Sequence, residues 1–150
     1  MRNIPEIRMG LIAVSRDCFP IELSQRRRRQ VANECEQKKI DIVELHTIIE
    51  NERDVDKALQ EIADKQINAL TVYLGNFGPE GPTTLLMQKF AGPVMVMAAA
   101  EESANDLIQG RGDAYCGLLS TMYNVGLRRL RPYLPAKPVA DAATVAECIA

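Results

Sequence analysis

Two short segments that follow apolar runs carry most of the side chains that could bind a polar ligand. The candidates for such binding are Arg16, Asp17, Asn76, Phe77 and Glu80. Arginine presents N–H donors in a fixed fork, amide and carboxylate groups pair with hydroxyls, and phenylalanine supplies an apolar wall. This mixture suits a ligand with several hydroxyl groups, such as a sugar. It is not specific, because Arg16 and Asp17 could equally pair with the scaffold.

The second segment has the pattern of a shaped loop between a strand and a helix. Glycine stands at Gly75, Gly78 and Gly81, and Pro82 opens an apolar helical pattern. Glycine allows close approach of a ligand or another backbone, and proline is preorganised for a first helical turn. In open α/β sheets, ligands bind at this carboxyl end of the strands. The glycine spacing does not match the dinucleotide fingerprint, so no NAD site is predicted, and a plain connecting turn stays open as an alternative.

The sequence predicts neither a metal site nor a catalytic residue. Its single histidine, His46, with Glu44 two residues before it, is more typical of a structural or surface residue than of a ligand. The cysteines are scattered without a Cys-x-x-Cys pair, at Cys18, Cys35, Cys116 and Cys148. Free thiols are therefore expected, with Cys116 as a buried packing residue. No Ser–His or Cys–His pair stands out as a nucleophile.

Composition and charge limit the class of protein. A length of 150 residues, 47% of them hydrophobic and 25% charged, indicates one globular domain with a real core. The net charge of −2 and the absence of Trp argue against nucleic acid and against an anionic membrane surface as partners. No apolar run reaches the length of a membrane span, and the N-terminus lacks a signal region, so a cytoplasmic location is expected.

Apolar runs and helical patterns alternate along the chain. Strands are predicted at residues 9–14, 40–45, 69–74 and 93–98. Helices are predicted at residues 22–38, from a cap at Asn51 or Asp54, after Pro82, and from a cap at Asp113 to Leu130. The alternation predicts an α/β fold, a doubly wound, flavodoxin-like parallel sheet of order about 2-1-3-4 flanked by helices. Its switch point lies between the first and third strands, so loops 15–20 and 75–81 should meet in one crevice.

Two further segments are interpreted from their composition. The arginines at 26–29 span a full helical turn and are expected to form a solvated face, with a subunit contact or an anion site as the alternative. Residues 1–138 are expected to form the flavodoxin-like domain, ending in an extended connector at 132–138. Residues 139–150 are expected to begin a connecting helix capped by Asp141, in a chain cut from a longer one.

Residues 9–16, 73–79 and 110–117 together resemble the N-terminal domain of the L-fucose/L-arabinose isomerase-like sugar isomerases. The similarity is one of pattern and covers essentially the whole chain. Members of that family interconvert aldoses and ketoses with a divalent metal, usually manganese. Their metal ligands and acid/base carboxylates lie in later domains. The resemblance therefore implies a domain that covers the sugar substrate and assembles a homo-oligomer but is not catalytic alone.

The resemblance also implies roles for individual residues. By position, Arg16 would reach the sugar of a neighbouring subunit and contribute nothing to the fold of its own domain. The loop around Asn76 and Phe77 would be a lid. Fucose members carry a tryptophan near that lid, for which Phe77 or Tyr73 could substitute, so the sugar preference stays open. The alternative function is a self-sufficient flavodoxin-like module that binds a small ligand or a partner.

Overall fold

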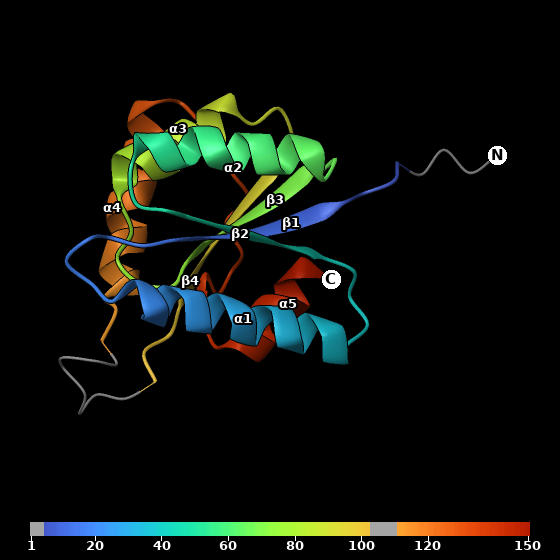
Figure 1. Cartoon of the computed structure of the whole chain (residues 1–150). Helices are drawn as coiled ribbons and strands as arrows, with labels where there is room; N and C mark the ends of the chain where they lie inside the picture. Colours follow the sequence, from blue (N-terminus) through green and yellow to red (C-terminus); the bar gives the residue numbers. More distant parts are fainter. Residues whose placement is uncertain (1–4, 103–110) are drawn as a thin grey trace.

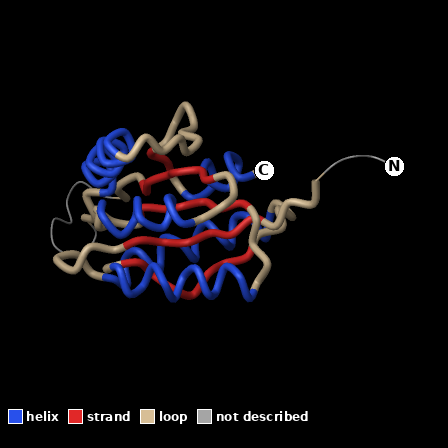
Figure 2. The backbone as a smooth tube through the Cα atoms, turned by 90° about the horizontal axis from the view of Figure 1, so that it is seen from above, coloured by secondary structure: helices blue, strands red, loops and turns tan. Residues whose placement is uncertain are grey.

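One parallel sheet forms the centre of the molecule. The computed structural model describes residues 5–102 and 111–150. The strands are β1 (Met9–Val14), β2 (Val43–Ile49), β3 (Ala69–Leu74), β4 (Val94–Ala99) and β5 (Val139–Ala140). Their order is β2-β1-β3-β4-β5, with every neighbouring pair parallel, and the strands run side by side in Figure 2. The predicted doubly wound fold and the order 2-1-3-4 are confirmed, and β5 extends the sheet at one edge.

Helices cover both faces of this sheet. They are α1 (Ile21–Gln37), α2 (Glu52–Asp64), α3 (Glu80–Lys89), α4 (Ala114–Leu127) and α5 (Ala142–Ile149). Figure 1 shows α2 and α3 above the sheet and α1 and α5 below it. Helix α1 packs against α5, while α3 packs against both α2 and α4. No helix in residues 5–102 and 111–150 is long and apolar enough to cross a membrane.

The two central strands are buried because both of their faces are covered. Every residue of β3 is buried, as are all residues of β1 after Met9. A strand that contacts helices on both sides needs apolar side chains at successive positions rather than at alternate ones. The continuous apolar runs of the sequence predicted this arrangement, and the bounds of β1 and β3 are the predicted ones.

Strand β2 begins three residues later than predicted. The backbone N–H of Ile40 donates to the carbonyl of Cys35 at 2.9 Å, and Lys39 has a left-handed φ of 57°. This turn satisfies carbonyl groups at the end of α1, so the residues after it are not yet available for the sheet. The strand then runs to Ile49, with Leu45 and Ile49 buried and His46 exposed, which is the alternation of an edge strand.

The segment predicted as an extended connector lies along the sheet edge. Tyr133 donates its N–H to the carbonyl of Val94 at 2.7 Å, and the carbonyl of Pro138 accepts from the N–H of Ala98 at 2.8 Å. Residues Val139 and Ala140 then form β5. No strand was predicted at residues 139–140, because a two-residue edge strand has no periodicity to detect.

Predicted helix caps fare differently from one helix to the next. Asn51 and Asp54 are both used, in a capping box that starts α2. Asp141 caps α5 as predicted, by accepting from the N–H of Thr144 at 2.8 Å. Asp113 occupies the N-cap position of α4, but its side chain makes no capping hydrogen bond and pairs instead with Arg111.

Glu61 ties α2 to the edge strand β2. Its carboxylate accepts from the backbone N–H groups of His46 at 2.8 Å and Thr47 at 3.0 Å, and it pairs with Lys65 at 2.7 Å. Burial of Glu61 opposes ionisation, but these hydrogen bonds outweigh it and lower the pKa of Glu61 to about 2. The carboxylate therefore stabilises the folded state only while it is ionised.

We predict that Glu61→Gln lowers the free energy of unfolding by about 1–2 kcal/mol near neutral pH. Because the folded-state pKa lies below the ordinary value of 4.5, this contribution is present above that value and is lost as the pH falls toward about 2. Urea unfolding from pH 7 to pH 2 should therefore show wild type and variant converging. Exposed Glu36, changed to Gln, is the control. A gap between wild type and E61Q that stays constant with pH would contradict the assignment.

Candidate functional site

The loop after β1 and the loop after β3 meet, and a buried asparagine joins them. The side-chain oxygen of Asn76 accepts from the backbone N–H of Arg16 at 3.0 Å and of Gly78 at 3.2 Å. Its amide nitrogen donates to Ser15 Oγ at 2.8 Å and to the carbonyl of Pro20 at 3.4 Å. These bonds use both donors and both acceptor positions of the amide. With an exposure of 0%, Asn76 positions the loops rather than presenting itself to a ligand.

Arg16 is held at this junction by charge and by an aromatic face. Its guanidinium carbon lies 4.7 Å from the centre of the Phe77 ring, and its Nη2 donates to Glu80 Oε2 at 2.6 Å. Phe19 stacks on Phe77 with ring centres 6.2 Å apart and planes at 11°. A cation over a ring face is attracted by the ring's quadrupole. The expectation that Arg16 contributes nothing to its own domain is therefore wrong.

Glu80 connects this arginine to α4. It is the first residue of α3, and its Oε1 accepts from Ser120 Oγ on α4 at 2.5 Å. Burial acts to raise the pKa of Glu80, but the hydrogen bond from Ser120, a backbone hydrogen bond and the charge of Arg16 together lower it. Glu80 is thus an anion that fixes the position of Arg16.

A close backbone contact fixes α4 against the same loop. A Cβ atom added at Gly117 of α4 would overlap the carbonyl oxygen of Phe77. Only a residue without a side chain lets the helix lie this close to the loop. Gly78, in the same loop, has a left-handed φ of 71°, which other residues rarely adopt. The conformation of the loop after β3 is therefore fixed both by the packing of α4 and by its own glycine.

The predicted crevice is open next to Arg16. A cleft of about 400 Å³ is lined by Arg16 and Asp17 from the first loop, by Glu50, Asn51 and Glu52 at the start of α2, and by Pro79 and Pro82. Of the five predicted residues, Arg16 directly contacts three others: Asn76, Phe77 and Glu80. Asp17 is exposed at the cleft beside them. Glu50 and Glu52 were not predicted as residues of the cleft, because their local sequence looks like an ordinary helix-capping segment.

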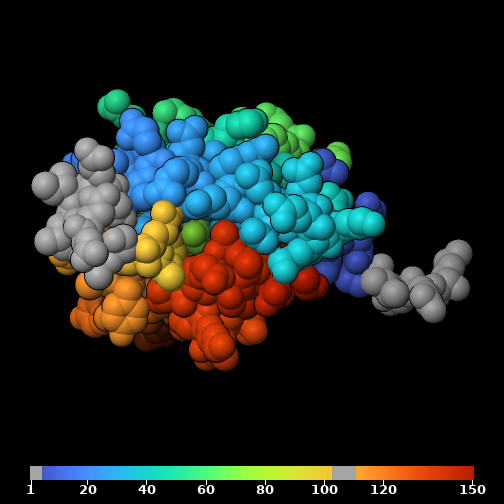
Figure 3. All heavy atoms as spheres, turned by 90° about the horizontal axis from the view of Figure 1, so that it is seen from below, coloured from blue at the N-terminus to red at the C-terminus, as the bar shows by residue number. Residues whose placement is uncertain are grey.

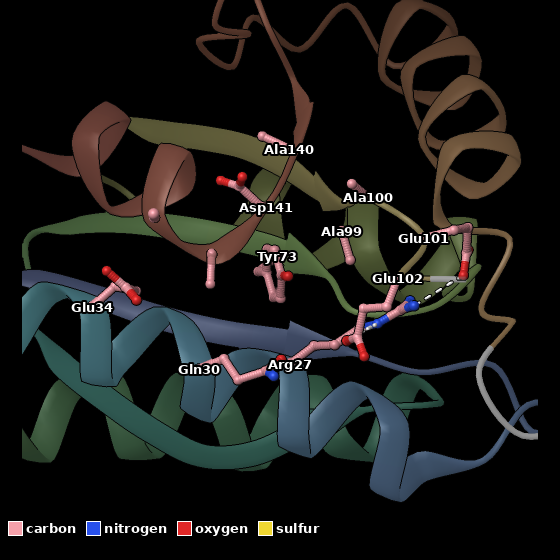
Figure 4. A pocket seen from close by; sticks show the side chains of 12 residues that line it. Arg27, Gln30, Glu34, Tyr73, Ala99, Ala100, Glu101, Glu102, Ala140 and Asp141 are labelled. Carbon is pink, nitrogen blue, oxygen red and sulfur yellow. Dashed lines mark hydrogen bonds and ion pairs between the residues drawn. The ribbon is translucent and has the colours of Figure 1, made fainter. Parts of the chain in front are cut away.

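A second cleft, of about 390 Å³, lies between α1 and α5 and was not predicted from the sequence. Figure 4 shows Arg27 reaching along its floor from α1, with Tyr73 of β3 beside it and Asp141 opposite. In Figure 3 the blue α1, the red C-terminal segment and the yellow segment near residue 100 surround it. Burial of Tyr73 raises its pKa above the ordinary value, so its hydroxyl stays protonated there.

The arginine run 26–29 is not the solvated face that was expected. Arg27 is 1% exposed, donates to the carbonyl of Gly75 at 2.8 Å and pairs with Glu101 at 2.9 Å. Arg28 is 3% exposed and pairs with Glu44 at 2.9 Å. A buried guanidinium is tolerated where carboxylates and carbonyls compensate its lost hydration. Both acidic partners are distant in sequence, so the run alone could not indicate them.

Among the residues that the structure describes, neither cleft contains a cluster of side chains that could hold a metal ion. His46 is exposed on β2 and lies outside the first cleft. Within residues 5–102 and 111–150, no three His, Cys, Asp or Glu side chains come together in a way that could hold a metal ion. Cys116 is exposed rather than buried, since the buried face of α4 is formed by other residues, so that expectation is wrong.

Comparison with protein-family models matches residues 10–150 to one described as the fucose/sulfoquinovose isomerase N-terminal domain. The match includes both loops of the first cleft and all of the helices. A search of curated proteins finds no match.

We predict that Asn76→Ala lowers the free energy of unfolding by about 2–4 kcal/mol, because it leaves buried donors and acceptors of two loops without partners. The matched control is Asn68→Ala, which removes two hydrogen bonds at the exposed opposite edge, to Arg8 and Glu6. Chemical unfolding should show a loss of less than about 1 kcal/mol for N68A. Equal losses for the two variants would contradict a special role for Asn76.

Proposed function

Because this chain belongs to the family of fucose/sulfoquinovose isomerase N-terminal domains, we propose that it covers the substrate in a cytoplasmic, metal-dependent aldose–ketose isomerase and helps its subunits assemble. The substrate in this proposal is a sugar, and the subunits form a homo-oligomer. The family match supports this function over that of a self-sufficient binding module.

The observation that carries the proposal is the presentation of Arg16. Its side chain is 35% exposed at the rim of the first cleft, although Glu80 and Phe77 hold it on two sides. The contact with Glu80 uses Nη2, whereas a guanidinium has five N–H donors in a fixed fork. Such a group can donate to sugar hydroxyl or carbonyl oxygens without leaving its support. The stacked rings of Phe77 and Phe19 add an apolar surface on one side of it.

The reaction itself is assigned to other parts of the full-length enzyme. The described residues bring together no group that could hold manganese or another divalent ion, so they do not fit the metal that the family resemblance implies. No chemical step is therefore assigned to this domain. Its part is to bind and orient the sugar and to keep water away from the reacting carbons.

We expect the 150-residue chain by itself to show no isomerase activity with any pentose or deoxyhexose, even with added manganese. The physical reason is that, by the family resemblance, the metal ligands and the acid/base carboxylates are supplied by later domains. Ketose formation would be measured against a control that contains the metal and sugar alone. Turnover above that control would contradict the proposal that catalysis takes place in other domains of the full-length enzyme.

In the full-length enzyme, Arg16→Ala should lower kcat/KM by roughly tenfold to a few hundredfold, which corresponds to about 1.5–3 kcal/mol for one charged hydrogen bond to the substrate. Its effect on the free energy of unfolding should stay below about 1 kcal/mol, since the pair with Glu80 is partly exposed. Both quantities would be measured on the same preparation.

Two variants serve as controls for this experiment. Arg29→Ala removes an arginine whose side chain is 63% exposed and which pairs with Glu44 away from the first cleft, so its kinetics should match wild type. Glu80→Gln loosens Arg16 without removing it and should cost less in kcat/KM than Arg16→Ala. Unchanged kinetics for R16A, with a lowered melting temperature, would show that Arg16 serves only the fold.

A further inference from the structure

Helix α4 has an outer face unlike that of any other surface helix in the described chain. Its fourteen residues include no Asp, Glu, Lys or Arg. The inner face contacts the domain through Ala114, Gly117, Leu118, Thr121 and Val125, which are all buried. The outer face carries large apolar side chains at every fourth position, namely Tyr115, Leu119, Tyr123 and Leu127.

These four residues, the α4 stripe, are strongly exposed. Their exposed fractions are 58% for Tyr115, 55% for Leu119, 69% for Tyr123 and 63% for Leu127. A helix that faces water normally carries charged residues on its outer side, as α2 does. An apolar stripe that is exposed along a whole helix indicates a surface made for contact.

The size of the stripe fits a protein interface. Two tyrosines and two leucines that are more than half exposed present on the order of 400–500 Å² of surface. A standard protein–protein interface buries about 800 Å² on each partner, so the stripe supplies roughly half of one. Neighbouring exposed residues of the same helix, Cys116 and Gly126, extend it without adding charge.

We propose that the α4 stripe pairs with the α4 stripe of a second copy of this chain, with the two helices antiparallel. The order of the stripe is Tyr, Leu, Tyr, Leu at a constant spacing of four. A two-fold axis on the outer face, midway between Leu119 and Tyr123, then sets Tyr115 against the partner's Leu127, and Leu119 against the partner's Tyr123. A parallel pair would stack like residues on one another and align the helix dipoles unfavourably.

The small residues of the same face suit this crossing. The antiparallel arrangement places Gly126 opposite the partner's Cys116, and a Cβ atom at Gly126 would have no neighbour within 4 Å in the single chain. Contacting helices lie about 8–10 Å apart, and small residues at the contact allow the lower value. An isologous contact of this kind closes on itself as a dimer. The inference deepens the assembly part of the proposed function, but it rests on the exposed face of this chain.

The test introduces charges at the two central positions, Leu119 and Tyr123. Leu119→Arg alone, or Tyr123→Glu alone, places a charge against an uncharged side chain in the contact and should raise the dimer dissociation constant by at least about 100-fold. The double variant L119R/Y123E should recover to within about tenfold of wild type, because the introduced arginine of one copy faces the introduced glutamate of the other. Sedimentation equilibrium of the 150-residue chain at micromolar concentrations measures all four proteins.

Controls distinguish a loss of the α4 contact from a loss of folding and from non-specific association through other exposed apolar residues. Tyr133→Glu changes an apolar residue that is 64% exposed outside α4, and it should leave the dimer intact. Far-UV circular dichroism and thermal unfolding should be the same for every variant. A monomeric wild type, a dimer insensitive to both single changes, or a double variant weaker than either single would each overturn the proposal. None of these results bears on the kinetics of Arg16→Ala, so the isomerase proposal is tested separately.

Discussion

The side chain of Asn76 is the constraint on which the functional end of this domain depends. Its amide group donates two hydrogen bonds and accepts two, all with groups in the loops after β1 and β3. Because it is buried, water cannot replace any of them cheaply. The two loops therefore keep one relative position, and the groups they carry are set before any ligand arrives. Such preorganisation reduces the ordering cost of binding.

A chain of contacts extends from this junction into the rest of the fold. The loop that Asn76 shapes presents Phe77, whose ring supports the Arg16 guanidinium. Glu80 anchors the same guanidinium and accepts from Ser120 on α4. Helix α4 lies close enough for this contact because residue 117 is glycine. Each of these contacts is either a short polar interaction or a tight steric one. A displacement of α4 would therefore shift Arg16.

The sequence was sufficient for those parts of the structure that depend on local pattern. Continuous apolar runs identified β1 and β3, and the alternation of strands and helices gave the switch point that brings Arg16 next to Asn76. It was insufficient where a residue's state depends on a distant partner. Arg27 and Arg28 are buried only because Glu101 and Glu44 compensate their charges, and β5 exists only because β4 is there to pair with it. Burial of a charged group is a tertiary property.

The polar site and the apolar stripe share one helix, and this links the two proposals physically. Ser120 turns inward to Glu80, while its neighbour Leu119 and the more distant Tyr123 face outward. Contact with a second copy along the outer face would restrict the motion of α4. By the contacts described above, it would then also restrict Glu80 and Arg16. Assembly would in this way order the residues that are proposed to bind the sugar. The coupling needs only that α4 behaves as a rigid element between its two faces.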